Sequence, residues 1–288
     1  MSMTKINWYP GHMKKAKDLI EENLPIIDII LEVVDARIPL SSKNPDISKI
    51  AKNKKRIIIL NKSDLVEKKQ LLPWKAYFKE NNMADEVLEL SAETGFNMSA
   101  LNPFIDKIYC EKKEKYLKRG LKTVNIRIMV VGIPNVGKSR LINRIIGRNS
   151  AAVGNIPGFT KGKQWIKIKD GIEILDMPGI LWPKFQKEEV GYNLAITGAI
   201  KDEILPIEDV ACMLIKKLID FQMWDVLEKK YKLTSEDKDK LTGEILEKIA
   251  FTNNILKKGG VPHTEQAARN ILRDYRNLKL AKVILDII

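Results

Sequence analysis

The residues best able to do chemistry form a loop suited to binding phosphates. Residues 132–139, GIPNVGKS, fit the pattern G-x-x-x-x-G-K-[ST], with an apolar run before them and a helical pattern after them. In such a loop, backbone N–H groups and a helix N-terminus surround the phosphates. We expect Lys138 to contact the β- and γ-phosphates and the Ser139 hydroxyl to ligate Mg²⁺. The other predicted nucleotide contacts here are Asn135, Val136, Gly137 and Arg140.

A second motif, DMPG at 176–179, predicts a magnesium and γ-phosphate contact. Asp176 ends an apolar run, so its carboxylate would hold Mg²⁺ through a water, while the Gly179 N–H would meet the γ-phosphate. Thr160, in PGFT, follows the phosphate loop at an interval that suits a switch threonine. Ser139, Thr160 and Asp176 are therefore the predicted metal-binding set.

A third group of residues predicts that the base is guanine. In Asn61-Lys62-Ser63-Asp64, the Asp64 carboxylate can accept from guanine N1–H and the exocyclic amine, which adenine cannot match. Such a site can reject the wrong base by orders of magnitude. We expect Asn61 at the opposite edge of the base, the Lys62 stem along its face, and a backbone N–H of Ser91-Ala92 at its oxygen. NKSD alone could be a surface turn; with the phosphate loop it predicts GTP.

These motifs stand in an unusual order. The guanine-reading NKSD and Ser91-Ala92 come before the phosphate loop, and Thr160 and DMPG follow it. An ordinary GTPase begins with the phosphate loop. The set is complete but rotated, which indicates a circular permutation.

The elements that must position these motifs alternate between strand and helix. Apolar, β-branched runs predict strands at 27–34, 56–60, 86–90, 125–131, 163–169 and 172–175. Helical periodicity predicts helices at 12–23, 67–81, 98–118 and 136–147. This alternation is typical of an α/β fold, here a P-loop GTPase domain with a mostly parallel sheet and helices on both faces.

The strand signal ends near residue 190, and amphipathic helices are expected at 194–200, 207–221, 235–251 and 264–287. We therefore predict a permuted GTPase domain over 1–185 and a smaller all-α domain over 186–288.

The charge distribution favours a polyanionic partner. The 288 residues carry a net charge of +13, yet only 16 of the 50 basic residues, against 15 of the 37 acidic ones, follow residue 200. A basic run, KKEKYLKRGLK, occupies 112–122. Such an excess fits RNA, although a solvated basic face is the open alternative.

The chain also has the composition expected of a cytoplasmic protein with no membrane partner. Its start lacks a signal-peptide pattern, and its most apolar stretch, 26–36, contains three acidic residues. The two cysteines, Cys110 and Cys212, lack paired spacing and are expected as free thiols.

The motif order resembles the circularly permuted GTPases, and further segments resemble one branch of them. These are WYPGHM at 8–13, DARIPLSSKNP at 35–45 and GILWPKF at 179–185, which are similar to the ribosome biogenesis GTPase A family (YlqF/RbgA type). The resemblance implies a GTP-hydrolysing factor for late maturation of the large (50S) ribosomal subunit. Such a factor binds rRNA in its GTP state, leaves on hydrolysis, and turns over slowly alone but faster on the particle. The implied partners are rRNA and ribosomal proteins of the subunit precursor, and we expect a monomer.

Two residue roles follow from this resemblance. Ile180 stands where many GTPases have a water-positioning Gln, so the resemblance favours His12 for that role; capping a helix or contacting RNA phosphate is its alternative. Asn135 resembles the Asn that ligates K⁺ in potassium-activated GTPases, and capping of the loop is equally open.

The predicted RNA contacts of the helical domain form a basic stripe. Spacings of 4, 3, 3 and 3 would put them on one helix face, and they are Arg269, Arg273, Arg276, Lys279 and Lys282. A solvated helix face is the alternative. A GTP-gated RNA-binding scaffold and a tRNA-modification GTPase are the alternative functions.

Overall fold

The computed structural model describes residues 12–51, 53–121, 123–147, 164–169, 171–182, 185 and 187–288, without the side chains of 12–16, 164 and 169. The predicted switch residue Thr160 lies outside these residues. The described chain falls into two compact units. We call the described residues between 12 and 184, together with 286–288, the sheet unit, and those between 185 and 285 the helical unit.

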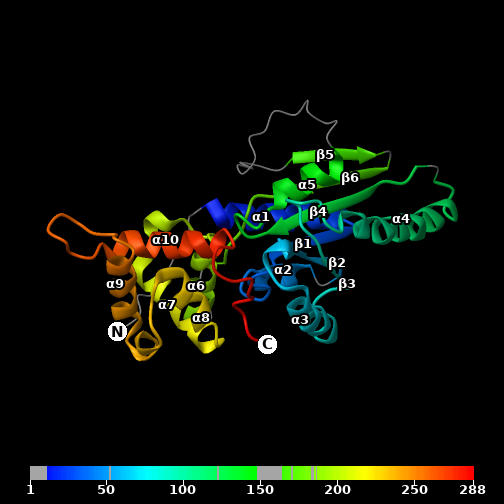
Figure 1. The fold of residues 1–288 in the computed structure, drawn as a ribbon. Helices are drawn as coiled ribbons and strands as arrows, with labels where there is room; N and C mark the ends of the chain where they lie inside the picture. The colour runs from blue at the N-terminus through cyan, green and yellow to red at the C-terminus, as the bar shows by residue number, and fades with distance from the viewer. Residues whose placement is uncertain are drawn as a thin grey trace. The chain divides into compact units, whose positions relative to one another are not determined.

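A six-stranded sheet organises the sheet unit, in the order β3-β2-β1-β4-β6-β5 (Figure 1). All neighbouring strands pair in parallel except β5, which is antiparallel to β6. The strands are β1 (Ile29–Asp35), β2 (Lys55–Asn61), β3 (Glu86–Glu89), β4 (Ile126–Gly132), β5 (Gln164–Lys169) and β6 (Ile172–Asp176). The α/β fold predicted from the sequence is confirmed.

The helices of this unit are α1 (His12–Asn23), α2 (Pro45–Ile50), α3 (Lys68–Glu80), α4 (Asn102–Leu117) and α5 (Lys138–Ile146). Ile20 of α1 and Ile47 of α2 join a buried cluster with Met129 of β4. Every residue of β1 is buried. Because alternate strand residues point to opposite faces, both faces of the sheet are covered at its centre.

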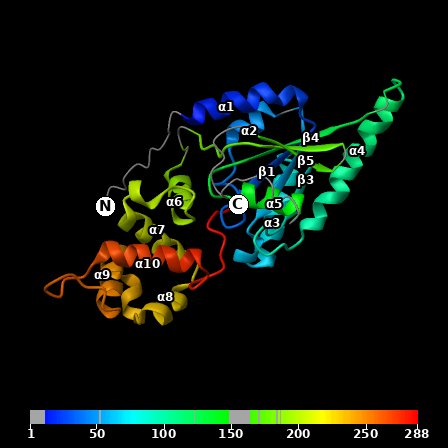
Figure 2. The ribbon, with the colours of Figure 1, turned by 90° about the horizontal axis from the view of Figure 1, so that it is seen from above.

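The helical unit contains α6 (Glu188–Ile196), α7 (Ile207–Asp220), α8 (Trp224–Tyr231), α9 (Thr242–Thr252) and α10 (Thr264–Arg276) (Figure 2). Its core is apolar, with Leu214, Ile249 and Ile271 fully buried. The sequence missed α8 and, in the sheet unit, α2. Both are short: α2 has six residues and α8 has eight, too few for a clear helical period.

The predicted helix over 264–287 is wrong beyond Arg276. Leu278 adopts a left-handed backbone with φ of 58°. Its N–H donates to Tyr275 O, and the Lys279 N–H donates to Asp274 O. This pair of hydrogen bonds is the Schellman motif, which ends a helix by satisfying its last carbonyls. Lys279 and Lys282 therefore lie past the end of α10, and the predicted stripe on one helix face is shortened to its arginines.

Among the residues that the structure describes, no helix is both long enough and apolar enough to cross a membrane.

Candidate nucleotide-binding site

The loop between β4 and α5 has a backbone that only glycine permits at two positions. Gly137 has φ of 97°, and a Cβ built on it would lie 2.4 Å from Asn61 Nδ2. A Cβ on Gly132 would lie 2.4 Å from Val33 O. Both distances are far inside normal contact, so a side chain at either position would push the loop away from its neighbouring strands. The glycines of the predicted phosphate loop thus fix its path against β1 and β2.

Lys138 is buried at the start of α5 with its ammonium turned into this loop. Its Nζ donates to Gly132 O at 3.1 Å and to Ile133 O at 2.9 Å. Burial lowers the pKa of Lys138 to about 8, and the nearby Asp176 carboxylate opposes this shift. A desolvated cation that gains from an anion is what the predicted phosphate contact requires.

The DMPG segment lies directly against the phosphate loop. A Cβ on Gly179 would lie 2.8 Å from Pro134 N and 3.1 Å from Lys138 Nζ. The next residue, Ile180, donates its N–H to Gly132 O at 3.2 Å. The segment that follows β6 is therefore in direct contact with the loop that is predicted to bind the phosphates.

The predicted magnesium ligands fit a hard divalent cation. Asp176 is buried at the end of β6, and Ser139 is half-buried in the first turn of α5. Carboxylate and hydroxyl oxygens are the ligand types that Mg²⁺ takes. Their ligand roles, and that of Thr160 outside the described residues, stay predictions.

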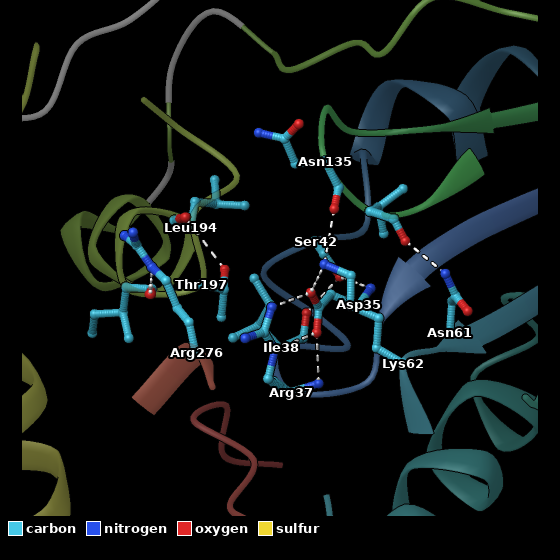
Figure 3. Close-up of polar contacts among 12 residues, drawn as sticks. Asp35, Arg37, Ile38, Ser42, Asn61, Lys62, Asn135, Leu194, Thr197 and Arg276 are labelled. Atoms are coloured by element: carbon cyan, nitrogen blue, oxygen red, sulfur yellow. Dashed lines mark hydrogen bonds and ion pairs between the residues drawn. The ribbon is translucent and has the colours of Figure 1, made fainter. Parts of the chain in front are cut away.

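Asn61 joins three loops of the site. Its Nδ2 donates to Val136 O at 2.8 Å (Figure 3). Its Oδ1 accepts from the Ala92 N–H at 3.0 Å. The sequence assigned Asn61 to an edge of the base and the Ser91-Ala92 amide to the base oxygen. In this structure the Asn61 amide holds the phosphate loop and the Ser91-Ala92 turn in place. The contacts of both with the base stay predictions.

Lys62 links the guanine-reading loop to the phosphate loop. Its backbone is left-handed, with φ of 62°. Its Nζ donates to Asn135 O and to Asp35 Oδ2, each at 2.8 Å. Arg37 also binds Asp35, through Nε and Nη2. Sequence reasoning missed Asp35 as a site residue, although its position at the carboxyl end of a buried strand beside NKSD was a usable signal.

The rest of the guanine-reading region is built on two turns. Ser63 is buried and donates its N–H to Leu90 O, while Asp64 is half-buried one residue later. The Ser91 hydroxyl accepts from the Thr94 N–H. These contacts place NKSD beside Ser91-Ala92, as the guanine prediction requires.

Two arginines of α5 hold the second of these turns. Arg144 donates to Ala92 O at 3.2 Å and to Glu93 O at 2.6 Å. Arg140 forms an ion pair with Glu93. Its guanidinium therefore faces the Ser91-Ala92 turn, and its predicted contact with the nucleotide stays a prediction.

The other predicted functional residues, the proposed catalytic histidine and the basic stripe, lie on α1 and on or just after α10. His12 is the first residue of α1, and its side chain lies outside the description. Arg276 pairs with Asp202 at 2.8 Å and donates to Ala195 O and Ile196 O, so it stabilises the helical unit. Arg269 pairs with Glu265, and Arg273 donates to Asn270. Of the predicted RNA stripe, Arg269 and Arg273 remain on the outer side of α10.

Comparison with known proteins agrees with this geometry. Residues 127–249 match the family described as "50S ribosome-binding GTPase". "Ribosome biogenesis GTPase A" of Bacillus cereus is 39% identical over 98% of this chain and 93% of its own. The protein of the same name from Priestia megaterium is 41% identical over 98% of this chain and 96% of its own. The GNP-bound structure of YlqF from T. maritima is 25% identical and covers 95% of this chain and 100% of its own, with a TM-score of 0.61.

The family model begins at β4 and so takes in the phosphate loop and DMPG, whereas NKSD lies before it. That is the order expected of a permuted chain. The similarity is about two residues in five over nearly the whole chain, and the four described motif groups lie in contact with one another. The chain is a GTPase and belongs to the ribosome biogenesis GTPase A family.

Proposed function

We propose that this GTPase acts in late maturation of the large (50S) ribosomal subunit, binding rRNA of the precursor in its GTP state and leaving after hydrolysis. The observation that supports this proposal is the similarity, over nearly the whole chain, to relatives named for ribosome biogenesis. The proposed partners are GTP and GDP, rRNA and ribosomal proteins, and the proposed state is a monomer in the cytoplasm.

For hydrolysis, we assign Ser139, Asp176 and Thr160 to Mg²⁺. The ion, when bound, neutralises charge on the β- and γ-phosphates. Ile180 is aliphatic and cannot orient a water by hydrogen bonding, so His12 is the proposed water-positioning residue. Its alternatives remain helix capping and a contact to RNA phosphate. We further propose that Asn135 ligates K⁺. If GTP turnover of Asn135→Ala depended on K⁺ as that of the wild type does, this hypothesis would be wrong.

For RNA binding, we assign the helical domain of 186–288 and the basic end of α4 in the GTPase domain of 1–185. On α10, Arg269 and Arg273 are the candidates, since Arg276 is held by Asp202. Lys279 and Lys282, which follow α10 and are exposed, stay candidates as well. On α4 and the turn after it, Lys113, Lys115, Lys118 and Arg119 are all exposed. Contacts of this kind contribute affinity and little sequence information.

The test is GTP turnover with and without purified large-subunit particles. We expect slow turnover of the protein alone, stimulation by the particles, and loss of that stimulation in His12→Ala. The nucleotide affinity of this variant serves as the control, because His12 is proposed to act on the water and not on the guanine or the phosphates. Turnover that particles leave unchanged, or normal stimulation of His12→Ala, would contradict the mechanism.

The alternative class is a GTP-gated RNA-binding scaffold in which hydrolysis is incidental. It predicts nucleotide-dependent binding to particles with no effect of the particles on turnover. The same experiment separates the two. A tRNA-modification GTPase has no supporting feature in the sequence.

A further inference from the structure

The carboxylate of Asp35 lies where the guanine-reading strand and its neighbour end. Asp35 closes β1 directly opposite Asn61, the last residue of β2. It is 3% exposed. Such a buried carboxylate is costly unless it is paired and hydrogen-bonded, so its partners indicate what it does.

Two cations share this carboxylate. Arg37 binds it with Nε to Oδ1 at 2.9 Å and Nη2 to Oδ2 at 2.7 Å, and Lys62 Nζ reaches Oδ2 at 2.8 Å (Figure 3). Burial alone would raise the pKa of Asp35, but Arg37 and Lys62 hold it well below its ordinary value. Asp35 is therefore a fixed negative charge.

Lys62 also contacts the phosphate loop, and this second contact connects the Asp35 carboxylate to that loop. The same Nζ donates to Asn135 O in the phosphate loop. Lys62 and Asn135 both have left-handed backbones, with φ of 62° and 58°. Residues held in such conformations persist only where their surroundings fix them, and they cluster at functional sites.

We propose that Asp35 is a positioning residue for GTP, which anchors Lys62 so that the guanine-reading loop and the phosphate loop are held at one spacing. Lys62 is a flexible side chain whose compact charge can point in many directions. Asp35 selects the direction that also reaches Asn135. Without it, the two loops that contact opposite ends of one nucleotide are free to shift apart.

The same strand offers a matched control at its other end. Asp28, just before β1, binds Lys112 at 2.8 Å and accepts the Arg127 N–H. It too is a carboxylate that joins a lysine and a backbone amide. Its partners belong to α4 and β4, away from the NKSD and phosphate loops. Loss of either carboxylate should cost stability, but only Asp35 should affect nucleotide binding.

The experiment measures dissociation constants for GDP and a non-hydrolysable GTP analogue, without ribosomal particles. For Asp35→Asn we expect weaker binding of both by about 10- to 100-fold, and a KM for GTP that rises by a larger factor than kcat falls. Asp28→Asn should bind both nucleotides as the wild type does. In a double-mutant cycle, Lys62→Ala should add little loss once Asp35 is replaced, because both changes break one bridge.

Asp35→Asn leaves Arg37 buried without its carboxylate, which can prevent folding. Asp35→Asn combined with Arg37→Gln removes that orphaned cation and keeps the test available. Unchanged nucleotide affinity in the folded variants, or full additivity with Lys62→Ala, would overturn the proposal. This test depends on GTP binding alone, so its outcome is independent of the proposed ribosomal role.

Discussion

At the scale of single residues, Lys138 makes nucleotide affinity depend on pH. Its pKa is about 8 in the nucleotide-free protein because burial disfavours the ammonium. Phosphates beside Nζ would raise that pKa again, so binding above pH 8 takes up a proton. The dissociation constant for GDP should therefore be flat below about pH 8 and rise above it, approaching about tenfold per pH unit.

The matched control for this prediction is Lys138→Arg, since arginine stays protonated across the range. This variant should bind GDP more weakly, but without the alkaline loss that belongs to Lys138. It also corrects for ionisation of guanine N1–H, which is common to both proteins. Equal pH slopes for the two would contradict the assigned pKa.

Folding stability should shift in the opposite direction over the same window. Between pH 8 and 10.5 the unfolded chain carries the proton on Lys138 that the folded protein lacks. The free energy of unfolding of the nucleotide-free protein should then rise with pH. Denaturant titrations of wild type and Lys138→Met across this range measure the difference.

Sequence reasoning placed residues well where a local pattern determines their position. The phosphate loop is one continuous segment between a strand and a helix, so Gly137 and Lys138 lie where the pattern puts them. The contacts of Asn61 with Val136 O and the Ala92 N–H were not predicted, because these partners are distant in sequence. Which loops meet at a sheet edge is tertiary information that NKSD alone does not contain.

At the scale of elements, α4 provides a basic surface that the fold does not need for packing. Ile105 is its only buried residue, and its C-terminal end projects beyond the sheet in Figures 1 and 2. Lys112 is occupied by Asp28 and Asn125 O. The lysines after it make no ion pair with another described residue, and Leu117 beside them is 57% exposed.

We therefore expect Lys113→Glu with Lys118→Glu to weaken binding to rRNA fragments or precursor particles and to flatten its salt dependence. Each lost phosphate contact lowers the slope of log affinity against log salt by about 0.7 to 0.9. GTP turnover of the protein alone should be unchanged, because this end of α4 is remote from the nucleotide loops.

The control carries the same change in net charge on another part of the sheet unit. Lys49→Glu with Lys69→Glu replaces two exposed lysines of α2 and α3. If only the total charge of the protein mattered, the two double variants would lose equal RNA affinity. Equal losses, or none in the α4 pair, would remove α4 from the RNA surface.

The strands were predictable as elements because each is an apolar, β-branched run, and each observed strand begins within two residues of its expected start. Helix ends were less predictable. Nothing in the sequence before Leu278 breaks the helical period, yet the left-handed turn there ends α10 at Arg276. A Leu in that conformation is uncommon, so local propensity would not have indicated it.

At the scale of the whole molecule, the permutation decides which segments adjoin the nucleotide. Because NKSD comes first, the chain leaves the sheet unit soon after DMPG, at residue 184. Gly179 packs on the phosphate loop, and Asn44 donates to Ile180 O at 3.3 Å. Gly179 is therefore only a few residues along the chain from the start of the helical unit at residue 185.

This connection predicts that the bound nucleotide alters protease sensitivity after DMPG. A γ-phosphate that accepts the Gly179 N–H would fix the start of the segment leading to Lys187 and Lys201, both of which are exposed. Trypsin should then cut at these lysines more slowly with a GTP analogue than with GDP. Lys257 and Lys258, exposed elsewhere in the helical unit, provide the internal reference, and their cleavage should not depend on the nucleotide. Identical rates at Lys187 and Lys201 in the two states would mean that the short covalent path does not transmit the γ-phosphate, and the permuted order would then need another explanation.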